Sequence, residues 1–273
     1  MLEVIHNTIC FNRDAVRQPR IPTAIIFESD EKSQNPGSRN IYVQLEPEVM
    51  NPVQNELIAR SQEYDFILTH NTYLLNRCKN AYFYVFGSSW ISENEYMAIN
   101  TKDKKFMLTS ITGGKRWAPG HRFRQDVYYE QLSITSIPTR FFISHHKNDL
   151  PVIANNPILY DRKIELFKDS QFSLVIENSK QINYFTEKLC DCLITKTIPV
   201  YWGCPNISDF FDTTGWIIIE TCSVEELLEK LEVLNKDYYM KYMDIVEKNF
   251  ETVKKYIDVT ENINRALCTI PDY

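Results

Sequence analysis

The chain has 273 residues, a mass of 32.2 kDa and 44% hydrophobic residues. This size allows one large domain or two small ones, each with enough apolar side chains for a buried core. The formal net charge is −6, which argues against general nucleic-acid binding, because affinity for the phosphate backbone requires clustered lysine and arginine.

Several other classes are excluded by missing patterns. None of the seven glycines forms G-x-G-x-x-G or G-x-x-x-x-G-K-[ST], so ordinary dehydrogenases and P-loop enzymes are unsupported. The seven cysteines form no C-x-x-C pair, which favours free thiols in a reducing compartment. No signal peptide and no run of eighteen apolar residues is present, so we expect a soluble, cytoplasmic protein without an integral membrane segment.

Strand-like runs recur through the first part of the chain. Because helical or loop stretches separate these runs, we expect a parallel sheet with covered faces. A polar stretch follows, and we place a domain boundary near residue 102, which gives a first domain of residues 1–102. The predicted strands are residues 2–5, 23–27, 41–45, 66–69 and 81–86.

The second part, residues 103–273, repeats the alternation of strands with helices or loops, and this predicts a second Rossmann-like domain. Residues 223–234 and 236–257 are strongly helical, and we expect the last helix to reach back across the first domain. The predicted strands are residues 106–112, 140–144, 172–176, 198–202 and 216–219, with a helix at about 120–131.

The strongest functional signal begins at the strand of residues 172–176. Glu177 and Asn178 follow this apolar run directly, at the position where parallel strands line ligand crevices. Thr186 then stands at an N-cap position, before an apolar helix face with 3.6-residue spacing. A strand end and a helix start therefore meet at one edge of the predicted sheet.

Glu187 and Lys188 open this helix. The free N–H groups and the positive dipole of a helix start favour a phosphate, and Lys188 adds a full charge. At about 4 Å and an effective dielectric constant near 20, one such pair contributes roughly 4 kcal/mol before desolvation. Alone, this T-E-K sequence would more often open an ordinary surface helix, but Glu177, Asn178 and Tyr184 converge on the same edge. The combination favours a diphosphate ligand.

Three motifs between residues 172 and 205 carry a resemblance to a known family. They read F-x-L-x-x-E-N-S, Y-x-T-E-K and T-I-P-V-Y-W-G-x-P, and together they resemble the donor-binding signature of the alpha-1,3-fucosyltransferase family, glycosyltransferase family 10. The rest of the chain matches this family only in outline. Animal members of the family carry a membrane anchor, which this sequence does not show, so the resemblance points to a bacterial member, a soluble enzyme of a large algal virus or a truncated form.

The resemblance implies the GT-B fold, in which two Rossmann-like domains face each other across a cleft. It also implies roles for five residues of this sequence. Glu187 would hold the ribose hydroxyls, Lys188 the diphosphate, Asn178 and Tyr184 the nucleotide, and Glu177 the sugar end of the donor.

An arginine that grips the donor phosphates is a further feature of the family. Arg124 lies in G-H-R-F-R-Q-D-V-Y-Y-E-Q-L, near the start of the corresponding helix, and its planar group could bind two phosphate oxygens. Three neighbours could take this role instead: Arg116, His121 and Arg122.

The catalytic base is expected in the first domain. Glu46 follows the strand I-Y-V-Q-L and would face the cleft, and the resemblance implies that a glutamate at such a position deprotonates the acceptor hydroxyl. Glu48 and Glu28 are alternatives, since each also lies close to the end of a predicted strand.

No metal cofactor is expected. The sequence contains no D-x-D motif, and the adjacent His145 and His146 are poor chelate partners without nearby carboxylates or cysteines. Lys188, Arg124 and the helix start would supply the positive charge instead.

The resemblance implies inverting transfer of fucose from GDP-fucose to a glycan hydroxyl. Alternatives are another GDP-deoxyhexose, a UDP-sugar such as UDP-xylose, or a nucleotide-sugar-binding module without turnover. The sequence predicts neither the acceptor glycan nor the oligomeric state.

Overall fold

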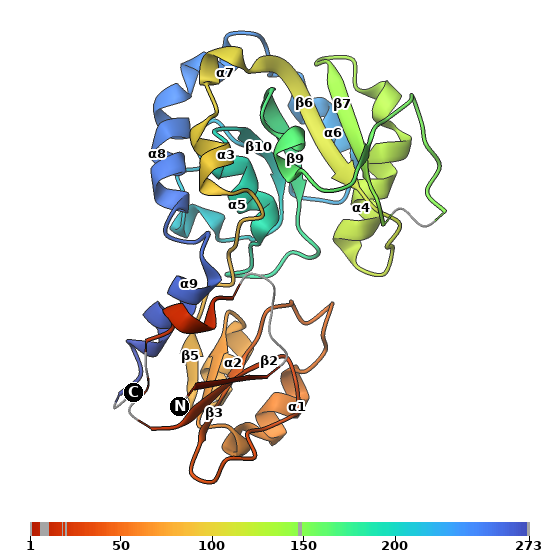
Figure 1. The fold of residues 1–273 in the computed structure, drawn as a ribbon. Coiled ribbons are helices and arrows are strands. Elements are labelled where there is room, and N and C mark those ends of the chain that lie inside the picture. The colour runs from red at the N-terminus through yellow and green to blue at the C-terminus, as the bar shows by residue number, and fades with distance from the viewer. Residues whose placement is uncertain (1, 6–10, 18, 20, 147–148, 272–273) are drawn as a thin grey trace.

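The computed structural model describes residues 2–5, 11–17, 19, 21–146 and 149–271, and it has two α/β domains (Figure 1). The first contains a parallel sheet with the strand order β1-β2-β3-β4-β5. Its strands are β1 (Leu2–Ile5), β2 (Thr23–Phe27), β3 (Arg39–Val43), β4 (Phe66–Thr69) and β5 (Ala81–Phe83).

One face of this sheet is covered by α-helices of the first domain. Ile26 and Tyr42 on that face pack with Leu57 of α1 (Gln54–Ala59) and Leu74 of α2 (Thr72–Arg77). The connections through α1 and α2 advance in the same direction along the sheet, and right-handed crossovers place such helices on one face. The alternate side chains of the same strands point to the opposite face.

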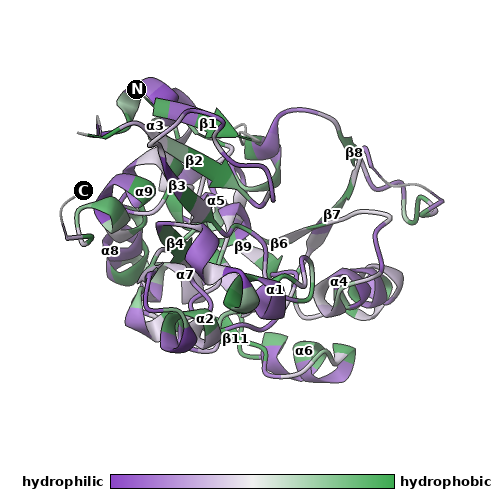
Figure 2. Cartoon of the chain, turned by 90° about the horizontal axis from the view of Figure 1, so that it is seen from below, coloured by the Kyte–Doolittle hydropathy of each residue, from purple (hydrophilic) through white to green (hydrophobic). Residues whose placement is uncertain are grey.

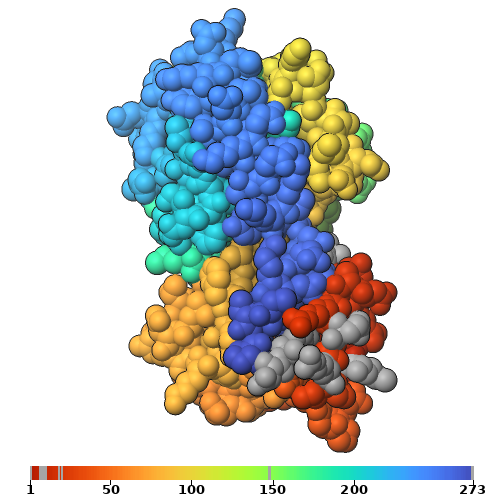
Figure 3. Space-filling model, turned by 90° about the vertical axis from the view of Figure 1, so that its left-hand side faces the viewer, coloured from red at the N-terminus to blue at the C-terminus, as the bar shows by residue number. Residues whose placement is uncertain are grey.

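That opposite face is covered by α9 (Val259–Leu267), which lies far away in sequence. Ile263 and Leu267 of α9 are fully buried in one core with Ile25 and Ile41 of the sheet. Figure 3 shows this dark blue segment between the orange and red parts of the first domain. The first domain therefore gains its second covering layer from the C-terminal part of the chain.

The second domain contains a parallel sheet with the strand order β11-β10-β9-β6-β7-β8. The chain runs outward from β6 in one direction and then from β9 in the other, so the topological switch point lies between β6 and β9. Ligands of such sheets bind beyond the carboxyl ends of the strands at this point. The strands are β6 (Lys105–Thr112), β7 (Thr139–Ser144), β8 (Ile158–Leu159), β9 (Ser170–Ile176), β10 (Ile198–Trp202) and β11 (Ile217–Ile218).

Helices cover both faces of the second sheet. One apolar core contains α4 (Pro119–Tyr129) and α6 (Val224–Leu231), and the other contains α5 (Glu187–Ile194) and α8 (Met243–Val253). Figure 2 shows hydrophobic and hydrophilic residues alternating along α4, α6 and α8. Each of these helices therefore presents an apolar stripe to the sheet.

The structure differs from the sequence predictions at several elements. Strand β8 was not predicted, because two residues are too few to show the alternating pattern of apolar and polar side chains that indicates a strand. The predicted helix 236–257 is divided into α7 (Tyr238–Lys241) and α8 at Tyr242, which leaves helical geometry with φ −108° and ψ 19°. A separate helix, α9, reaches the first domain instead.

The chain crosses between the domains earlier than the boundary predicted near residue 102. Ile91 and Tyr96, the latter in α3 (Glu93–Met97), pack in the α5–α8 core of the second domain. The polar composition of this stretch concealed the two buried side chains. The chain crosses back to the first domain just before α9. Asn262 connects the two crossings, because its Nδ2 donates to the carbonyl oxygen of Phe86 in the first crossing at 3.1 Å and to that of Tyr256 in the second at 2.9 Å.

Two whole-chain expectations concern membranes and cysteines. Within the described parts of the chain, no helix has the length and apolar composition needed to cross a bilayer. The six described cysteines have free thiols, and Cys10 lies outside the described residues.

The packing of α9 leads to a stability prediction. Replacing Ile263 by alanine leaves a cavity between α9 and the first sheet, so we expect Ile263→Ala to lower the free energy of unfolding by about 2–5 kcal/mol in denaturant titrations. The exposed Glu261 of the same helix provides the control Glu261→Gln, which should change stability by less than about 1 kcal/mol. Equal effects of the two substitutions would contradict the covering role of α9.

Candidate active site

The polar residues of the site lie where carboxyl ends of strands from the two domains approach each other. Glu46 and His70 follow β3 and β4 of the first sheet, and Glu177 follows β9 of the second. Contacts between the domains fix this arrangement. Asn183 Nδ2 donates to the carbonyl oxygen of His70 at 3.4 Å, and the His70 ring lies 5.3 Å from that of Tyr184.

Glu177 organises the start of α5. Its side chain is fully buried, and its carboxylate accepts hydrogen bonds from the backbone N–H of Thr186 at 2.9 Å and from the Thr186 hydroxyl at 2.8 Å. Because the Thr186 hydroxyl uses its hydrogen to bond Glu177, its oxygen can accept the backbone N–H of Lys188 at 3.3 Å. Thr186 is therefore the N-cap residue of α5. The carboxylate is therefore engaged inside the domain rather than directed toward a ligand.

Two glycines allow the backbone to approach Glu177 closely. A Cβ on Gly120, in the first turn of α4, would lie 1.7 Å from the carbonyl oxygen of Glu177. A Cβ on Gly203, directly after β10, would lie 2.7 Å from Glu177 Cγ. Both positions require a residue without a side chain, which explains the glycine in the V-Y-W-G motif.

Among the basic residues proposed for the phosphates, Arg124 is placed at the end of β9. Its guanidinium donates to the carbonyl oxygen of Ile176 at 2.6 Å and to Asn178 Oδ1 at 3.0 Å. Burial lowers the pKa of Arg124, and the nearby carboxylates of Glu177 and Glu187 oppose this shift. Arg124 and Asn178 thus form one unit beside the start of α5.

The three alternatives to Arg124 have other contacts. Arg116, in the loop before α4, donates to Gln125 Oε1 at 2.6 Å, and Arg122, in the first turns of α4, donates to the carbonyl oxygen of Trp117 at 3.0 Å. The Nδ1 atom of His121 accepts the N–H of Ala118 at 3.3 Å, and burial followed by the charge of Arg124 lowers its pKa to about 4. A neutral His121 therefore supports the first turn of α4.

Glu187 and Lys188 lie together in the first turn of α5. Lys188 Nζ is 3.0 Å from Glu187 Oε1 and 4.0 Å from Glu177 Oε2, and its side chain remains 25% exposed. Burial raises the pKa of Glu187, but the ammonium groups of Lys188 and Lys163 outweigh it and hold this pKa at about 2. Lys188 is thus a partly exposed cation whose present partner could be exchanged for a phosphate.

Glu46 approaches this cation from the first domain. Burial raises its pKa, whereas the charge of Lys188 and a hydrogen bond with the Asn178 side chain lower it. The Oε2 atom of Glu46 is buried and has no hydrogen-bond partner. The site therefore contains a carboxylate oxygen able to accept a proton next to a cation from the opposite domain.

The three glutamates considered as the catalytic base have different contacts in the structure. Glu48 accepts the N–H of Gln54 at 3.1 Å and holds the start of α1. Glu28 accepts two backbone N–H groups of the loop after β3, those of Leu45 and Glu46. Of the three, Glu46 is the one whose carboxylate faces the second domain.

Three residues of this region were missed by the sequence analysis. Lys163 is 2.8 Å from the fully buried Asp191 and 3.6 Å from Glu187, so it connects two acidic residues of α5. Asp191 also accepts the N–H of Trp90 at 2.9 Å, which attaches the segment between the domains to α5. His70 is fully buried, and neither of its ring nitrogens has a partner. None of the three belongs to a local motif that could have revealed it.

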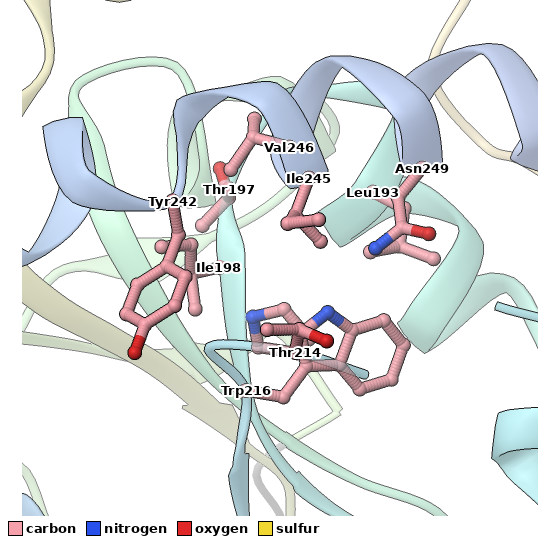
Figure 4. Close-up of a pocket in the computed structure, with 10 residues that line it drawn as sticks. Leu193, Thr197, Ile198, Thr214, Trp216, Tyr242, Ile245, Val246 and Asn249 are labelled. Atoms are coloured by element: carbon pink, nitrogen blue, oxygen red, sulfur yellow. The ribbon is translucent and has the colours of Figure 1, made fainter. Parts of the chain in front are cut away.

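Two hollows of the structure are lined by residues other than Glu46, Arg124 and Lys188. The cavity in Figure 4 lies between α8 and the sheet, where Ile245 faces Trp216, and its volume is about 10 Å³, enough for one water molecule. A hollow of about 140 Å³ lies beyond β10 and β11, lined in part by Lys180 and Cys204. In the described part of the chain, no group of three or more His, Cys, Asp or Glu side chains is arranged to hold a metal ion.

Comparison with known proteins identifies the family. The sequence profile of glycosyltransferase family 10 (fucosyltransferase), C-terminal part, matches residues 117–273. The chain belongs to this family. The matched residues include Arg124, Glu177, Glu187 and Lys188, and therefore most of the site described above.

Relatives of this family 10 chain include fucosyltransferases of known sequence. It is 27% identical to alpha-(1,3)-fucosyltransferase FucT of Helicobacter pylori over 88 residues, which are 32% of this chain and 18% of that protein. It is 26% identical to a putative fucosyltransferase-like protein of Arabidopsis thaliana over 203 residues, which are 74% of this chain and 36% of that protein. The chain thus spans well under half the length of these two relatives.

Solved structures establish the fold of this family 10 chain as GT-B. An alpha1,3-fucosyltransferase with GDP superimposes with a TM-score of 0.52 and 13% identity, covering 87% of this chain and 77% of that one. TarM of S. aureus, in complex with UDP, superimposes with a TM-score of 0.59 and 12% identity, covering 90% and 54%. The predicted fold class and family are therefore confirmed.

The low pKa of Glu187 predicts how stability depends on pH. Its folded-state pKa of about 2 lies below the ordinary value of 4.5, so its ionised form stabilises the folded state above pH 4.5, and this contribution is lost as the pH falls toward 2. Replacing Glu187 by glutamine should cost on the order of 2–3 kcal/mol near neutral pH and less than about 1 kcal/mol near pH 2.5, as measured by urea unfolding.

The exposed Glu232, in the control variant Glu232→Gln, should show little difference from the unmodified protein at either pH. If the cost of Glu187→Gln is the same at both pH values, the ion pairs with Lys163 and Lys188 do not stabilise the fold.

Proposed function

We propose that the protein is an inverting glycosyltransferase that transfers a sugar from a nucleoside-diphosphate sugar, with GDP-fucose ranked first, to a hydroxyl of a glycan. The observation that carries this proposal is the meeting of Lys188 and Glu46. A cation at a helix start and a carboxylate with a free oxygen come from opposite domains and act electrostatically on each other. Such an arrangement suits a leaving diphosphate on one side and an acceptor hydroxyl on the other.

The second domain would bind the donor. The N–H groups and dipole of α5 favour a diphosphate, and Lys188 would exchange Glu187 for a phosphate oxygen. Glu187 would then hold the ribose hydroxyls, while Asn178 and Tyr184 contact the nucleotide. Since Arg124 already donates to Asn178, it can direct its remaining N–H groups to the same phosphates.

Glu177 takes a different part in this proposal from the one implied by the family resemblance. Its carboxylate is occupied by Thr186, so we assign it the positioning of α5 rather than contact with the sugar. Tyr184 is 1% exposed and lies against His70. We therefore propose that the domains separate at this contact when the nucleotide enters.

The proposed reaction is a single displacement at the anomeric carbon. The acceptor oxygen forms a bond to that carbon while the bond from the carbon to the diphosphate oxygen breaks, and Glu46 takes the proton of the hydroxyl. The electron pair of the broken bond remains on the diphosphate, where Arg124 and Lys188 stabilise it. These charges develop mainly in the transition state, so both contributions raise the rate.

The identity of the donor can be tested by ligand-dependent melting. A compound that binds only the folded protein raises the melting temperature by mass action, so GDP-fucose, GDP-mannose, UDP-xylose, UDP-glucose and the free nucleotides are compared. We expect the largest shift with GDP-fucose. Turnover of another nucleotide sugar but not of GDP-fucose would reassign the donor, whereas binding without turnover of any donor would leave a binding module.

Replacing Lys188 by alanine should weaken GDP binding about 10- to 100-fold, because a charge-assisted contact to the diphosphate is lost. Isothermal titration calorimetry measures this affinity. Lys180→Ala is the matched control, since Lys180 is exposed and pairs with Glu220 on the surface. Unchanged affinity of the Lys188 variant would place the diphosphate elsewhere.

Replacing Glu46 by glutamine should lower kcat by about 10²- to 10⁴-fold, because the proton acceptor is lost. The affinity for GDP should change little, since Glu46 belongs to the acceptor side. Glu48→Gln is the control, because Glu48 holds the start of α1. Full turnover by the Glu46 variant would exclude it as the base.

We propose that the reaction needs no metal ion, because Lys188, Arg124 and α5 supply positive charge to the diphosphate. Activity in excess EDTA should then equal that of the untreated protein. A loss of activity that Mn²⁺ restores would overturn this part of the proposal.

A further inference from the structure

Glu28 adopts an unusual backbone conformation directly behind the proposed base. It follows β2 with φ 45°, in the left-handed region that a residue with a Cβ rarely occupies. Glycine, which has no Cβ, would adopt this backbone conformation more easily. Conformations of this kind persist where the surrounding structure holds them in place, and they concentrate at functional sites.

The side chain of Glu28 holds the loop that carries Glu46. Its Oε1 atom accepts the backbone N–H of Leu45 at 2.9 Å and that of Glu46 at 2.6 Å. A hydrogen bond with the Asn51 side chain engages the same carboxylate. The backbone of Glu46 is thus fixed from behind, while its own carboxylate extends toward the second domain.

Glu28 also acts on Glu46 through its charge. Groups from several elements face Glu46: Lys188 and Glu187 in α5, Tyr184 before it, Asn178 after β9, and Glu28 after β2. Burial is the main cause of the raised pKa of Glu46, Lys188 opposes it, and Glu28 adds to it. A negative charge on Glu28 therefore favours the protonated form of Glu46.

We propose that Glu28 is a positioning residue for the reaction, which fixes the backbone of Glu46 through two hydrogen bonds and so holds its carboxylate toward the second domain. This inference rests on the proposed function, in which Glu46 is the base. Glu28 itself does not contact the substrate, so its effect appears in turnover and in the pH profile rather than in donor binding.

Two substitutions separate the two effects. In Glu28→Gln the amide oxygen can still accept both backbone N–H groups, but the negative charge is removed. In Glu28→Ala the hydrogen bonds are lost as well. Glu48→Gln is the matched control, because it removes a negative charge two residues beyond Glu46 without altering the contacts of Glu28.

The experiment measures kcat and the donor KM between about pH 4.5 and 9 for the full chain and the three variants. We expect Glu28→Gln to keep most of kcat near neutral pH and to move the acidic limb of the profile down by about one pH unit. We expect Glu28→Ala to lose about 10- to 100-fold in kcat with a donor KM within about twofold. The control should follow the unmodified protein.

A Glu28→Gln profile that coincides with that of the unmodified protein would overturn the inference, and so would a rise in donor KM that matches the fall in kcat. GDP-dependent melting shows which variants are folded, and if Glu28→Ala does not fold, the pH profile of Glu28→Gln decides. Glu46→Gln distinguishes the two proposals. If it retains turnover, Glu46 is not the base and the assignment on which this inference rests fails, whereas an inactive Glu46→Gln together with unaffected Glu28 variants removes only the role of Glu28.

Discussion

The buried carboxylate of Glu177 is the interaction on which the site depends. Burying a charged group is costly unless it is paired and hydrogen-bonded, and Glu177 meets this requirement by accepting hydrogen bonds from the backbone N–H and the hydroxyl of Thr186. The same contact orients Thr186 to cap α5, and α5 in turn presents Glu187 and Lys188. The glycines on either side of Glu177 exist because the backbone must approach it so closely.

Charge in the site is balanced before any ligand arrives. Glu187 and Lys188 neutralise each other, Lys163 is shared by Glu187 and Asp191, and Arg124 lies against backbone and amide oxygens. A chain with a net charge of −6 can therefore offer positive groups to a diphosphate without leaving them unpaired in its absence. In the proposed function, a diphosphate would replace Glu187 as the partner of Lys188.

Sequence reasoning was most successful where the chain is locally regular. The start of α5 at Thr186 could be predicted, because an N-cap residue and an apolar helical period lie side by side in the sequence. Glu28 was recognised only as a rival of Glu46, since its bonds to the loop depend on how β2 and β3 align. Lys163 and Asp191 are 28 positions apart, and only the packing of the second domain brings them together.

The long-range position of α9 has a consequence for how the protein is made. Strands β1 to β5 leave the ribosome early, but the helix that covers one apolar face of their sheet is synthesised only after the entire second domain. Until then that face stays open to water and to other exposed chains. We expect the second domain to mature first, with the first domain completing its core in a late step that chaperones are suited to protect.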